Sequence, residues 1–287
     1  MPMTTTNHRT TADLPNGNCS GPFLVLGATG KTGRLVAARL AARSHQVRAA
    51  SRRSATRFDW NDKSTWVPAL DGTRAMYLVP PDPGTDVDRF VDLAAASDVG
   101  RIALLSARNP GQSGDAHLAA VEAAVTGGST PWVILRPSWF AQNFNEGFLA
   151  AGLIEGTLRL PVGDGREPFI DTDDIASVAV AALTDGRHEG CTYELSGPET
   201  LSFAEAVTHI AVAAGRSLDF VDVEAEQYAA ELAGYDTAPA LIATLTHLFA
   251  AIRAGDNDYV SNGVEQALGR EPTSFTAYAA RVASTFT

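Results

Sequence analysis

The chain has 287 residues, of which 45% are hydrophobic and 19% are charged, and its formal net charge is −11. This length accommodates one large α/β domain or a main domain with a smaller lobe, and the apolar content supplies a full core. Because the charge is negative and no basic run outweighs it locally, the composition excludes nucleic acid and anionic membranes as expected partners. We therefore expect a small-molecule partner.

Cysteine usage and the amino-terminal segment indicate the compartment. The two cysteines, Cys19 and Cys191, support neither a disulfide framework nor a thiolate metal site, which favours a reducing cytoplasm. Residues 1–20 lack the apolar centre of a signal peptide and are predicted to form a disordered tail. Since no run of about 18 apolar residues follows, we expect a soluble, cytoplasmic protein.

The segment VLGATGKTGRLV at 25–36 contains glycines typical of a phosphate-binding loop. A P-loop needs glycine five residues before Gly30, where Val25 stands in an apolar run, so this interpretation fails. The glycines instead follow a GxxGxxG spacing between a strand, FLVLG at 23–27, and an amphipathic helix, as in dinucleotide-binding folds. The alternative is a merely structural turn. The predicted cofactor-binding residues are Gly27, Ala28, Thr29, Gly30, Lys31, Thr32 and Gly33.

The second predicted strand, at 45–51, ends in a basic turn. No acid stands between Gly27 and Phe58, so the usual partner of the ribose 2′-hydroxyl of NAD is missing. Ser51, Arg52 and Arg53 stand there instead, and guanidinium groups suit forked recognition of a 2′-phosphate. The turn therefore favours NADPH/NADP over NADH, and its alternative interpretation is a solvated basic turn.

Strand and helix patterns continue to alternate along the chain. This alternation predicts an α/β fold with a Rossmann-type doubly wound parallel sheet. We assign residues 21–155 to an NADP-binding Rossmann domain and 156–287 to a smaller, mostly helical substrate lobe, partly interwoven with the sheet. Strands are expected at 75–80, 101–106, 131–137 and 191–197; helices at 85–100, 116–128, from about Asp174, at 202–215 and over most of 224–287; and a hairpin-like stretch before Asp174.

Seven segments between about residues 23 and 200 carry a family resemblance: GATGKTGRLV, ASRR, FDWND, YLVPP, LLSA, ILRPSWFAQNF and EPFIDTDDIASVAVAAL. They resemble the NmrA-like branch of the atypical short-chain dehydrogenases and, within it, the ergot-alkaloid type reductases such as agroclavine and festuclavine dehydrogenases. The resemblance implies that Asp59 and Trp60 lie beside the adenine, that Val79, Pro80 and Pro81 border its ribose, and that Ser106 ends a strand near the nicotinamide.

The helix after LLSA departs from the usual dehydrogenase pattern. It reads AHLAAVEAAV and lacks the Tyr-x-x-x-Lys pair in which tyrosine protonates the developing alkoxide. His117 is its only side chain with a pKa suited to proton transfer near neutrality. The candidate catalytic residues are His117 and Ser106, the alternatives being a histidine without a chemical role and an ordinary strand-end serine.

The segment RPSWFAQNF supplies the candidate substrate contacts. Trp139, Phe140 and Phe144 offer aromatic faces to a flat, hydrophobic ligand, and Asn143 offers a polar contact. The alternatives are packing of the lobe on the sheet and a helix or turn cap. No metal site is predicted, because DTDD at 171–174 is typical of a helix start, with Asp173 or Thr172 as the cap.

These features favour a reductase whose substrate is already electrophilic. The predicted function is NADPH-dependent reduction of an iminium, quinone or conjugated carbonyl group in a hydrophobic substrate of secondary metabolism. One alternative is a redox sensor that binds NADP(H) without turnover, as some NmrA-like proteins do. Another is an isomerase or cyclase using the same pocket. The sequence leaves the oligomeric state open.

Overall fold

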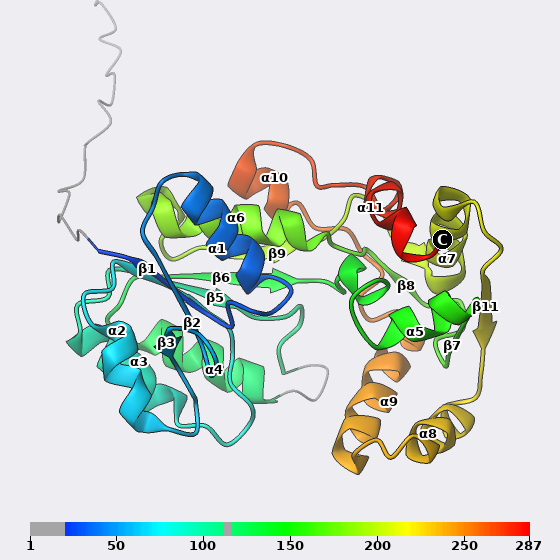
Figure 1. The fold of residues 1–287 in the computed structure, drawn as a ribbon, viewed down its shortest axis with the longest axis horizontal. Coiled ribbons are helices and arrows are strands. Elements are labelled where there is room, and N and C mark those ends of the chain that lie inside the picture. Colours follow the sequence, from blue (N-terminus) through cyan, green and yellow to red (C-terminus); the bar gives the residue numbers. More distant parts are fainter. Residues whose placement is uncertain (1–20, 112–115) are drawn as a thin grey trace, which may run out of the picture.

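The structure, a computed structural model, describes residues 21–111 and 116–287; the predicted tail and Cys19 lie outside these ranges. Seven strands form one parallel sheet in the order β3-β2-β1-β4-β5-β6-β9 (Figure 1). The order reverses between β1 and β4, so the predicted doubly wound Rossmann-type sheet is confirmed. The strands are β1 (Phe23–Leu26), β2 (Val47–Ser51), β3 (Thr56–Arg57), β4 (Ala75–Leu78), β5 (Ile102–Leu105), β6 (Trp132–Pro137) and β9 (Thr192–Leu195).

Helices cover both faces of this sheet. The central strands β1, β4 and β5 are buried at every residue, which explains why their sequences are continuous apolar runs without alternation. One face packs against α1 (Gly33–Ala42), α6 (Thr172–Thr184) and α10 (Gly263–Leu268), and the other against α2 (Trp66–Leu70), α3 (Val87–Ala96) and α4 (Ala116–Gly127) (Figure 1).

A helical lobe with a core of its own lies beside the sheet (Figure 1). Its two small sheets pair β7 with β11 in parallel and β8 with β10 in antiparallel. The expected hairpin is therefore wrong, because β7 and β8 find partners later in the chain and not each other. The lobe contains α5 (Phe148–Glu155), β7 (Thr157–Leu160), β8 (Arg166–Glu167), β10 (Leu201–Ser202), α7 (Phe203–Ala214), β11 (Asp219–Asp222), α8 (Ala225–Gly234), α9 (Pro239–Ala254) and α11 (Phe275–Val282).

Sheet and lobe are built from interleaved stretches of chain. Leu149 and Leu153 of α5 belong to the core of the lobe, whereas α6, β9 and α10 return to the sheet. The chain therefore crosses between the two bodies several times after β6. These crossings bring loops at the carboxyl edge of the sheet against α9.

The start of α6 differs by two residues from the expectation. The helix begins at Thr172, and its cap is Asp171, whose side chain accepts a hydrogen bond from the Asp173 amide at 2.9 Å. The predicted caps, Asp173 and Thr172, are therefore wrong, because both already lie within the first turn. In the described ranges no group of three or more His, Cys, Asp or Glu residues could hold a metal ion. None of the helices described is long and apolar enough to cross a membrane.

Candidate cofactor and substrate site

The glycine loop between β1 and α1 has three glycines with different tasks. Gly27 adopts a φ of +65°, and its carbonyl accepts a hydrogen bond from the Gly30 amide at 2.9 Å. A Cβ at Gly33 would lie 2.3 Å from that same carbonyl oxygen, so only glycine allows α1 to approach β1 this closely. A Cβ at Gly30 would meet, among described atoms, only the Gly27 oxygen at 3.2 Å. Space for a ligand therefore remains above Gly30.

The amino end of α1 carries backbone donors that no described side chain caps. Thr32 occupies the cap position without a side-chain cap bond, and the first turn contains no acid. Such an end attracts anions through its free N–H groups and the helix dipole. The loop therefore fits a pyrophosphate. Thr29 and Gly30 are exposed, whereas Thr32 is buried and Ala28 packs against the apolar core.

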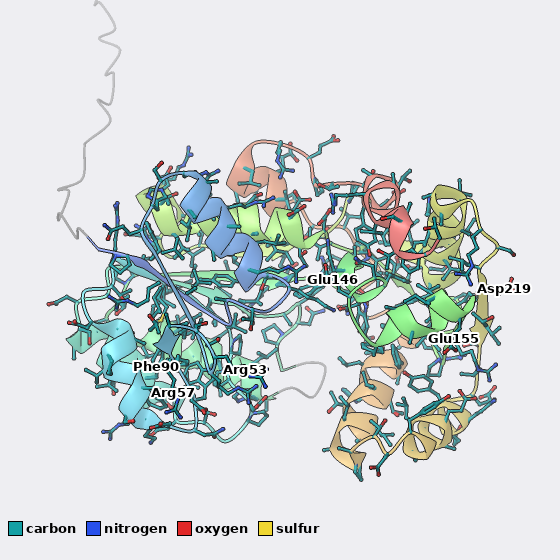
Figure 2. The ribbon with its side chains drawn as sticks, in the orientation of Figure 1. Arg53, Arg57, Phe90, Glu146, Glu155 and Asp219 are labelled. Atoms are coloured by element: carbon teal, nitrogen blue, oxygen red, sulfur yellow. The ribbon has the colours of Figure 1, made fainter. Side chains whose placement is uncertain are left out.

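The basic turn after β2 is held by its serines. The Ser51 and Ser54 hydroxyls lie 2.6 Å apart, and the Arg53 amide donates to the Ser51 hydroxyl at 3.3 Å. Arg52 and Arg53 are exposed, and neither forms an ion pair with any described residue. Figure 2 places Arg53 at the edge of the sheet, near Arg57, which pairs with Asp62 at 3.3 Å. Two cationic side chains are therefore available to a phosphate.

We expect replacement of Arg52 and Arg53 by alanine to weaken NADPH binding by about tenfold, or roughly 1.4 kcal/mol, while NADH binding stays unchanged. The reason is that only NADPH carries a 2′-phosphate for these charges. Calorimetric titration of both cofactors measures the effect. The control is Arg187→Ala, which removes another exposed arginine. Equal affinities of the wild-type protein for NADPH and NADH would contradict the prediction.

Of the residues predicted around the adenosine, Val79 lies against the glycine loop, and Trp60 packs on the aromatic cluster beneath α3. The Trp60 ring packs edge-on against Phe90, with ring centroids 4.8 Å apart, and is half-buried. Asp59 is half-buried, and its carboxylate accepts from the Asn61 amide at 3.0 Å. Val79 lies against Gly27, followed by half-buried Pro80 and buried Pro81. Their contact with a cofactor stays a prediction.

A cleft of about 980 Å³ opens where the carboxyl ends of β4, β5 and β6 face α9. Its walls combine aromatic and aliphatic side chains with a few polar groups, which is typical of small-molecule sites. Sequence-predicted residues from five separate segments meet here. They are Lys31, Pro81, Ser106, His117, Trp139, Phe140 and Asn143.

Phe144 does not belong to this group. Its side chain is fully buried, and its ring packs against Phe169, Phe203 and Phe275 with centroids 5.1, 5.8 and 5.4 Å away. The short helix η2 (Ala141–Asn143) turns the chain so that Phe144 points into the core of the lobe. The predicted substrate contact of Phe144 is therefore corrected to a packing role.

Ser106 belongs to a buried polar network that the sequence did not predict. Its hydroxyl donates to Glu122 of α4 at 2.5 Å, and Arg136 of β6 binds both oxygens of the same carboxylate. This pairing raises the pKa of Arg136. The Ser106 hydroxyl already donates its proton to Glu122. Toward a ligand, the Ser106 oxygen can therefore only accept a hydrogen bond.

His117 bridges two elements at the mouth of the cleft. Its Nε2 lies 2.8 Å from the Pro81 carbonyl oxygen, so this nitrogen carries the proton and donates it. The bond joins the start of α4 to the loop after β4. Any exchange of a proton with a substrate would have to use the other ring nitrogen or break this bond.

Lys31 connects the glycine loop to the lobe. Its Nζ donates to the Asn143 side-chain oxygen at 2.5 Å, and Arg34 pairs with Glu146 at 2.6 Å. Figure 2 shows Glu146 between the sheet and the lobe. Burial lowers the pKa of Lys31, while Glu146 opposes the shift. Asn143 therefore positions the lysine, in addition to lining the cleft.

Glu167 is a further cleft residue, and it is not among the residues predicted for the site. Its side chain is 1% exposed, and its Oε1 accepts from the Asn257 side chain at 3.1 Å. Burial raises the pKa of its carboxyl to about 7, against the opposing effects of Asn257 and Arg108. Glu167 is the first residue of the segment EPFIDTDDIASVAVAAL, but the residues that surround its side chain lie far away in the sequence, so the segment alone does not indicate a role for it.

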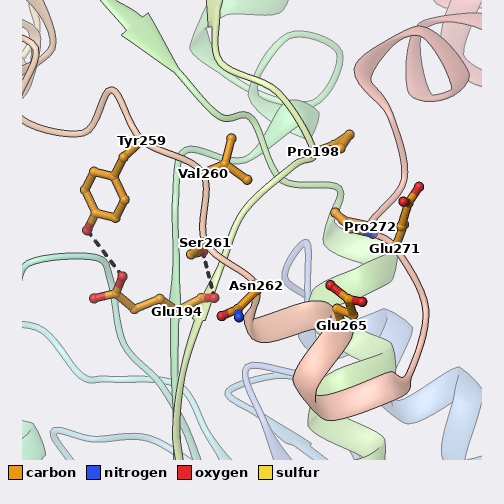
Figure 3. Close-up of a pocket in the computed structure, with 9 residues that line it drawn as sticks. All are labelled: Glu194, Pro198, Tyr259, Val260, Ser261, Asn262, Glu265, Glu271 and Pro272. Carbon is orange, nitrogen blue, oxygen red and sulfur yellow. Dashed lines mark hydrogen bonds between the residues drawn. The ribbon is translucent and has the colours of Figure 1, made fainter.

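A second, smaller pocket lies between the end of β9 and α10, with a volume of about 570 Å³ (Figure 3). Three carboxylates, Glu194, Glu265 and Glu271, line it. The Tyr259 hydroxyl donates to the Glu194 carboxylate at 3.3 Å, as Figure 3 shows. Because these charges repel phosphates and no predicted residue lines this pocket, the larger cleft is the candidate site.

This chain is similar to known proteins over most of its length. The sequence pattern of the NAD(P)H-binding family matches residues 27–186, more than half of the chain. The oxidoreductase YesF of Bacillus subtilis (strain 168) is 34% identical over 282 residues, which cover 93% of this chain and 96% of YesF. Festuclavine synthase I of Penicillium roqueforti (strain FM164) is 30% identical over 280 residues, which cover 90% and 96%.

Solved structures share the fold at lower identity. The NADPH-dependent quinone oxidoreductase QOR2 of Escherichia coli superposes with a TM-score of 0.74 and 20% identity, over 91% of this chain and 99% of that one. An NmrA variant superposes with a TM-score of 0.72 and 15% identity, over 92% and 96%. At these identities the likeness concerns the fold alone.

Proposed function

Because this chain belongs to the NAD(P)H-binding family, we propose that it is an NmrA-like, NADPH-dependent reductase of an iminium, quinone or conjugated carbonyl group. One observation carries this proposal. Lys31 of the phosphate-type glycine loop donates a hydrogen bond to Asn143, and both residues line the aromatic cleft. A dinucleotide on the loop and a substrate in the cleft would therefore be neighbours. Relatives named as oxidoreductases and as a festuclavine synthase support the reaction class.

The cofactor would be held by the residues already described. The open space at Gly30 and the uncapped start of α1 accept the pyrophosphate, and Arg52 and Arg53 accept the 2′-phosphate. NADPH supplies a hydride when it is bound. We assign the ring faces of Trp139 and Phe140, together with Leu248 of α9, to a flat, hydrophobic substrate of secondary metabolism.

The cleft favours substrates that arrive already electrophilic. The Tyr-x-x-x-Lys pair is missing from α4, and the Ser106 hydroxyl donates to Glu122. Neither group can therefore polarise an ordinary ketone by donating a proton to it. An iminium carbon, a quinone and a conjugated carbonyl need less activation of this kind.

The proposed function is tested by the loss of NADPH absorbance with a panel of iminium, quinone and conjugated-carbonyl compounds. The wild-type protein should oxidise NADPH with at least one compound class, and NADH more slowly. The control is the Gly30→Val variant, which should bind no cofactor. Tight NADPH binding without oxidation by any compound would overturn the reductase and favour the sensor of the NADP(H) ratio. Conversion of a compound without NADPH consumption would favour an isomerase or cyclase.

We expect His117→Ala to reduce turnover by less than about a hundredfold, the lower limit of positioned general acid catalysis. The Nε2–H of His117 donates a hydrogen bond to the Pro81 carbonyl oxygen, so this side chain connects α4 to the loop after β4. Steady-state rates with the best compound of the panel measure the effect, and NADPH affinity should stay unchanged. A loss of a thousandfold or more would identify His117 as the proton donor.

A further inference from the structure

Glu167 is buried at the floor of the cleft with one carboxyl oxygen left over. Its Oε1 accepts from Asn257, the Trp139 backbone N–H faces the carboxyl and lowers its pKa, and its Oε2 forms no hydrogen bond of good geometry with a described residue. The neighbouring Trp139 indole nitrogen, which also belongs to a cleft-lining residue, is buried without a described partner as well. A buried carboxyl oxygen without a well-formed hydrogen bond is costly for the fold, so its presence in a ligand cleft points to a ligand.

The carboxyl is held in place from two sides of the cleft. Asn109, in the loop after β5, donates to the Asn257 side-chain oxygen at 3.1 Å, and Asn257 in turn donates to Glu167. Arg108 binds the same carboxyl-terminal loop through the Tyr259 carbonyl at 2.8 Å. These bonds hold Glu167 in place, and Oε2 is the carboxyl oxygen that forms no hydrogen bond of good geometry with a described residue.

Charged groups from four elements face or adjoin this carboxyl. Arg108 favours the ionised form and Asp258 opposes it, while burial has the largest effect and favours the neutral acid. His247 of α9 and Asp256 line the same cleft. Arg166, the neighbour on β8, is paired with Glu205 at 2.9 Å and is not available to Glu167. No ion pair with Glu167 is formed in the part of the chain that the structure describes.

We propose that Glu167 is the proton donor of the cleft. The inference rests on the proposed reductase function and narrows its substrate class. A hydride from bound NADPH would form a C–H or O–H bond on a quinone or a conjugated ketone as the C–H bond of the dihydronicotinamide breaks and NADP+ is left, and an electron pair would move onto a substrate oxygen. The O–H bond of the Glu167 carboxyl then breaks, and its proton forms the new O–H bond of the reduced substrate. The carboxylate is reprotonated by water.

An iminium ion accepts a hydride and becomes a neutral amine, so it needs no such donor. A buried acid in the cleft therefore favours quinones and conjugated carbonyl compounds over iminium ions. The pKa of about 7 supports this role, because an acid is most effective when its pKa lies near the working pH.

The test compares wild-type protein with Glu167→Gln, which keeps the size of the side chain and an acceptor for Asn257. The probe is 1,4-naphthoquinone, with NADPH oxidation followed in single turnovers between about pH 5 and pH 9. The wild-type rate should fall as the pH rises through about 7, the pKa of Glu167. The variant should be slower by at least about a hundredfold and should lack this pH dependence, with its NADPH affinity unchanged.

A second readout does not depend on turnover. The folded-state pKa of Glu167 is raised, so its contribution to stability is present at low pH and is lost as the pH rises through about 7. Urea unfolding of the wild-type protein should show this loss, and Glu167→Gln should not. The matched control is Glu199→Gln, which changes an exposed glutamate that forms no ion pair with a described residue and should leave both readouts as in the wild type.

The outcomes separate the two proposals. If the wild-type protein reduces naphthoquinone and Glu167→Gln does so at the same rate with the same pH profile, Glu167 is not the donor and the reductase function stands. If the wild-type protein binds NADPH but reduces no probe, both proposals fail. If Glu167→Gln does not fold, Glu167→Asp takes its place. This variant keeps an acid on a shorter side chain, so it should be slower than wild type while retaining a pH-dependent rate, and an undiminished rate would count against the inference.

Discussion

Replacement of Gly30 by valine should weaken NADPH binding by at least about a hundredfold, or roughly 2.7 kcal/mol, in a protein that stays folded. A side chain at Gly30 meets little of the protein itself, since its Cβ would contact only the Gly27 oxygen at 3.2 Å among described atoms. The branched side chain would instead fill the space into which a pyrophosphate must come. Calorimetric titration measures the loss, and thermal unfolding shows that the fold survives.

The Gly33→Ala variant distinguishes two causes of lost cofactor affinity, a blocked binding site and a distorted glycine loop. Its Cβ would lie 2.3 Å from the Gly27 oxygen and 2.8 Å from the Gly27 carbonyl carbon, so α1 must move away from β1. We expect this variant to lose stability as well as cofactor affinity. Undiminished NADPH affinity in folded Gly30→Val protein would show that the loop is only a structural turn.

Asp171→Ala should destabilise the protein by about 3–4 kcal/mol, because it removes a buried acceptor on which three segments depend. The Asp171 side chain is 1% exposed and accepts hydrogen bonds from the Asp173 amide at 2.9 Å and from Gln142 at 2.7 Å. It also pairs with Arg281 of α11. The change therefore uncaps α6, leaves the Gln142 amide without its acceptor, and leaves Arg281 with only its longer pair to Asp173 at 3.7 Å. Urea unfolding at neutral pH measures the effect.

Asp185→Ala is the matched control, since Asp185 also caps a short helix by accepting from a backbone amide, that of Arg187 at 3.0 Å. Its carboxylate is 41% exposed, and its pair with Arg187 lies at the surface. We expect a loss below about 1 kcal/mol, because exposed pairs and caps contribute little. Equal losses in both variants would mean that the burial of Asp171 has no bearing on stability.

The sequence by itself determined the architecture, and it predicts the cofactor end of the site. Continuous apolar strands, the GxxGxxG spacing and the absence of an acid after the second strand are local features, and each depends on residues close together in the chain. The parallel Rossmann-type sheet followed from them, because a strand covered on both faces must be apolar throughout. Helix α6 was also predicted, although the expected cap, Thr172 or Asp173, lies one or two residues after the observed cap, Asp171.

Only the tertiary structure decided what the substrate end contains. Phe144 and Trp139 stand five residues apart in one aromatic segment, yet the turn at Ala141–Asn143 sends one into the core of the lobe and leaves the other at the cleft. β7 and β8 resemble a hairpin locally, but each pairs with a strand later in the chain. Glu167 meets Asn257 across 90 positions of sequence, and burial there changes its acidity. The local sequence pattern determines secondary structure, whereas burial and long-range pairing determine which side chains reach the cleft and how their pKa values shift.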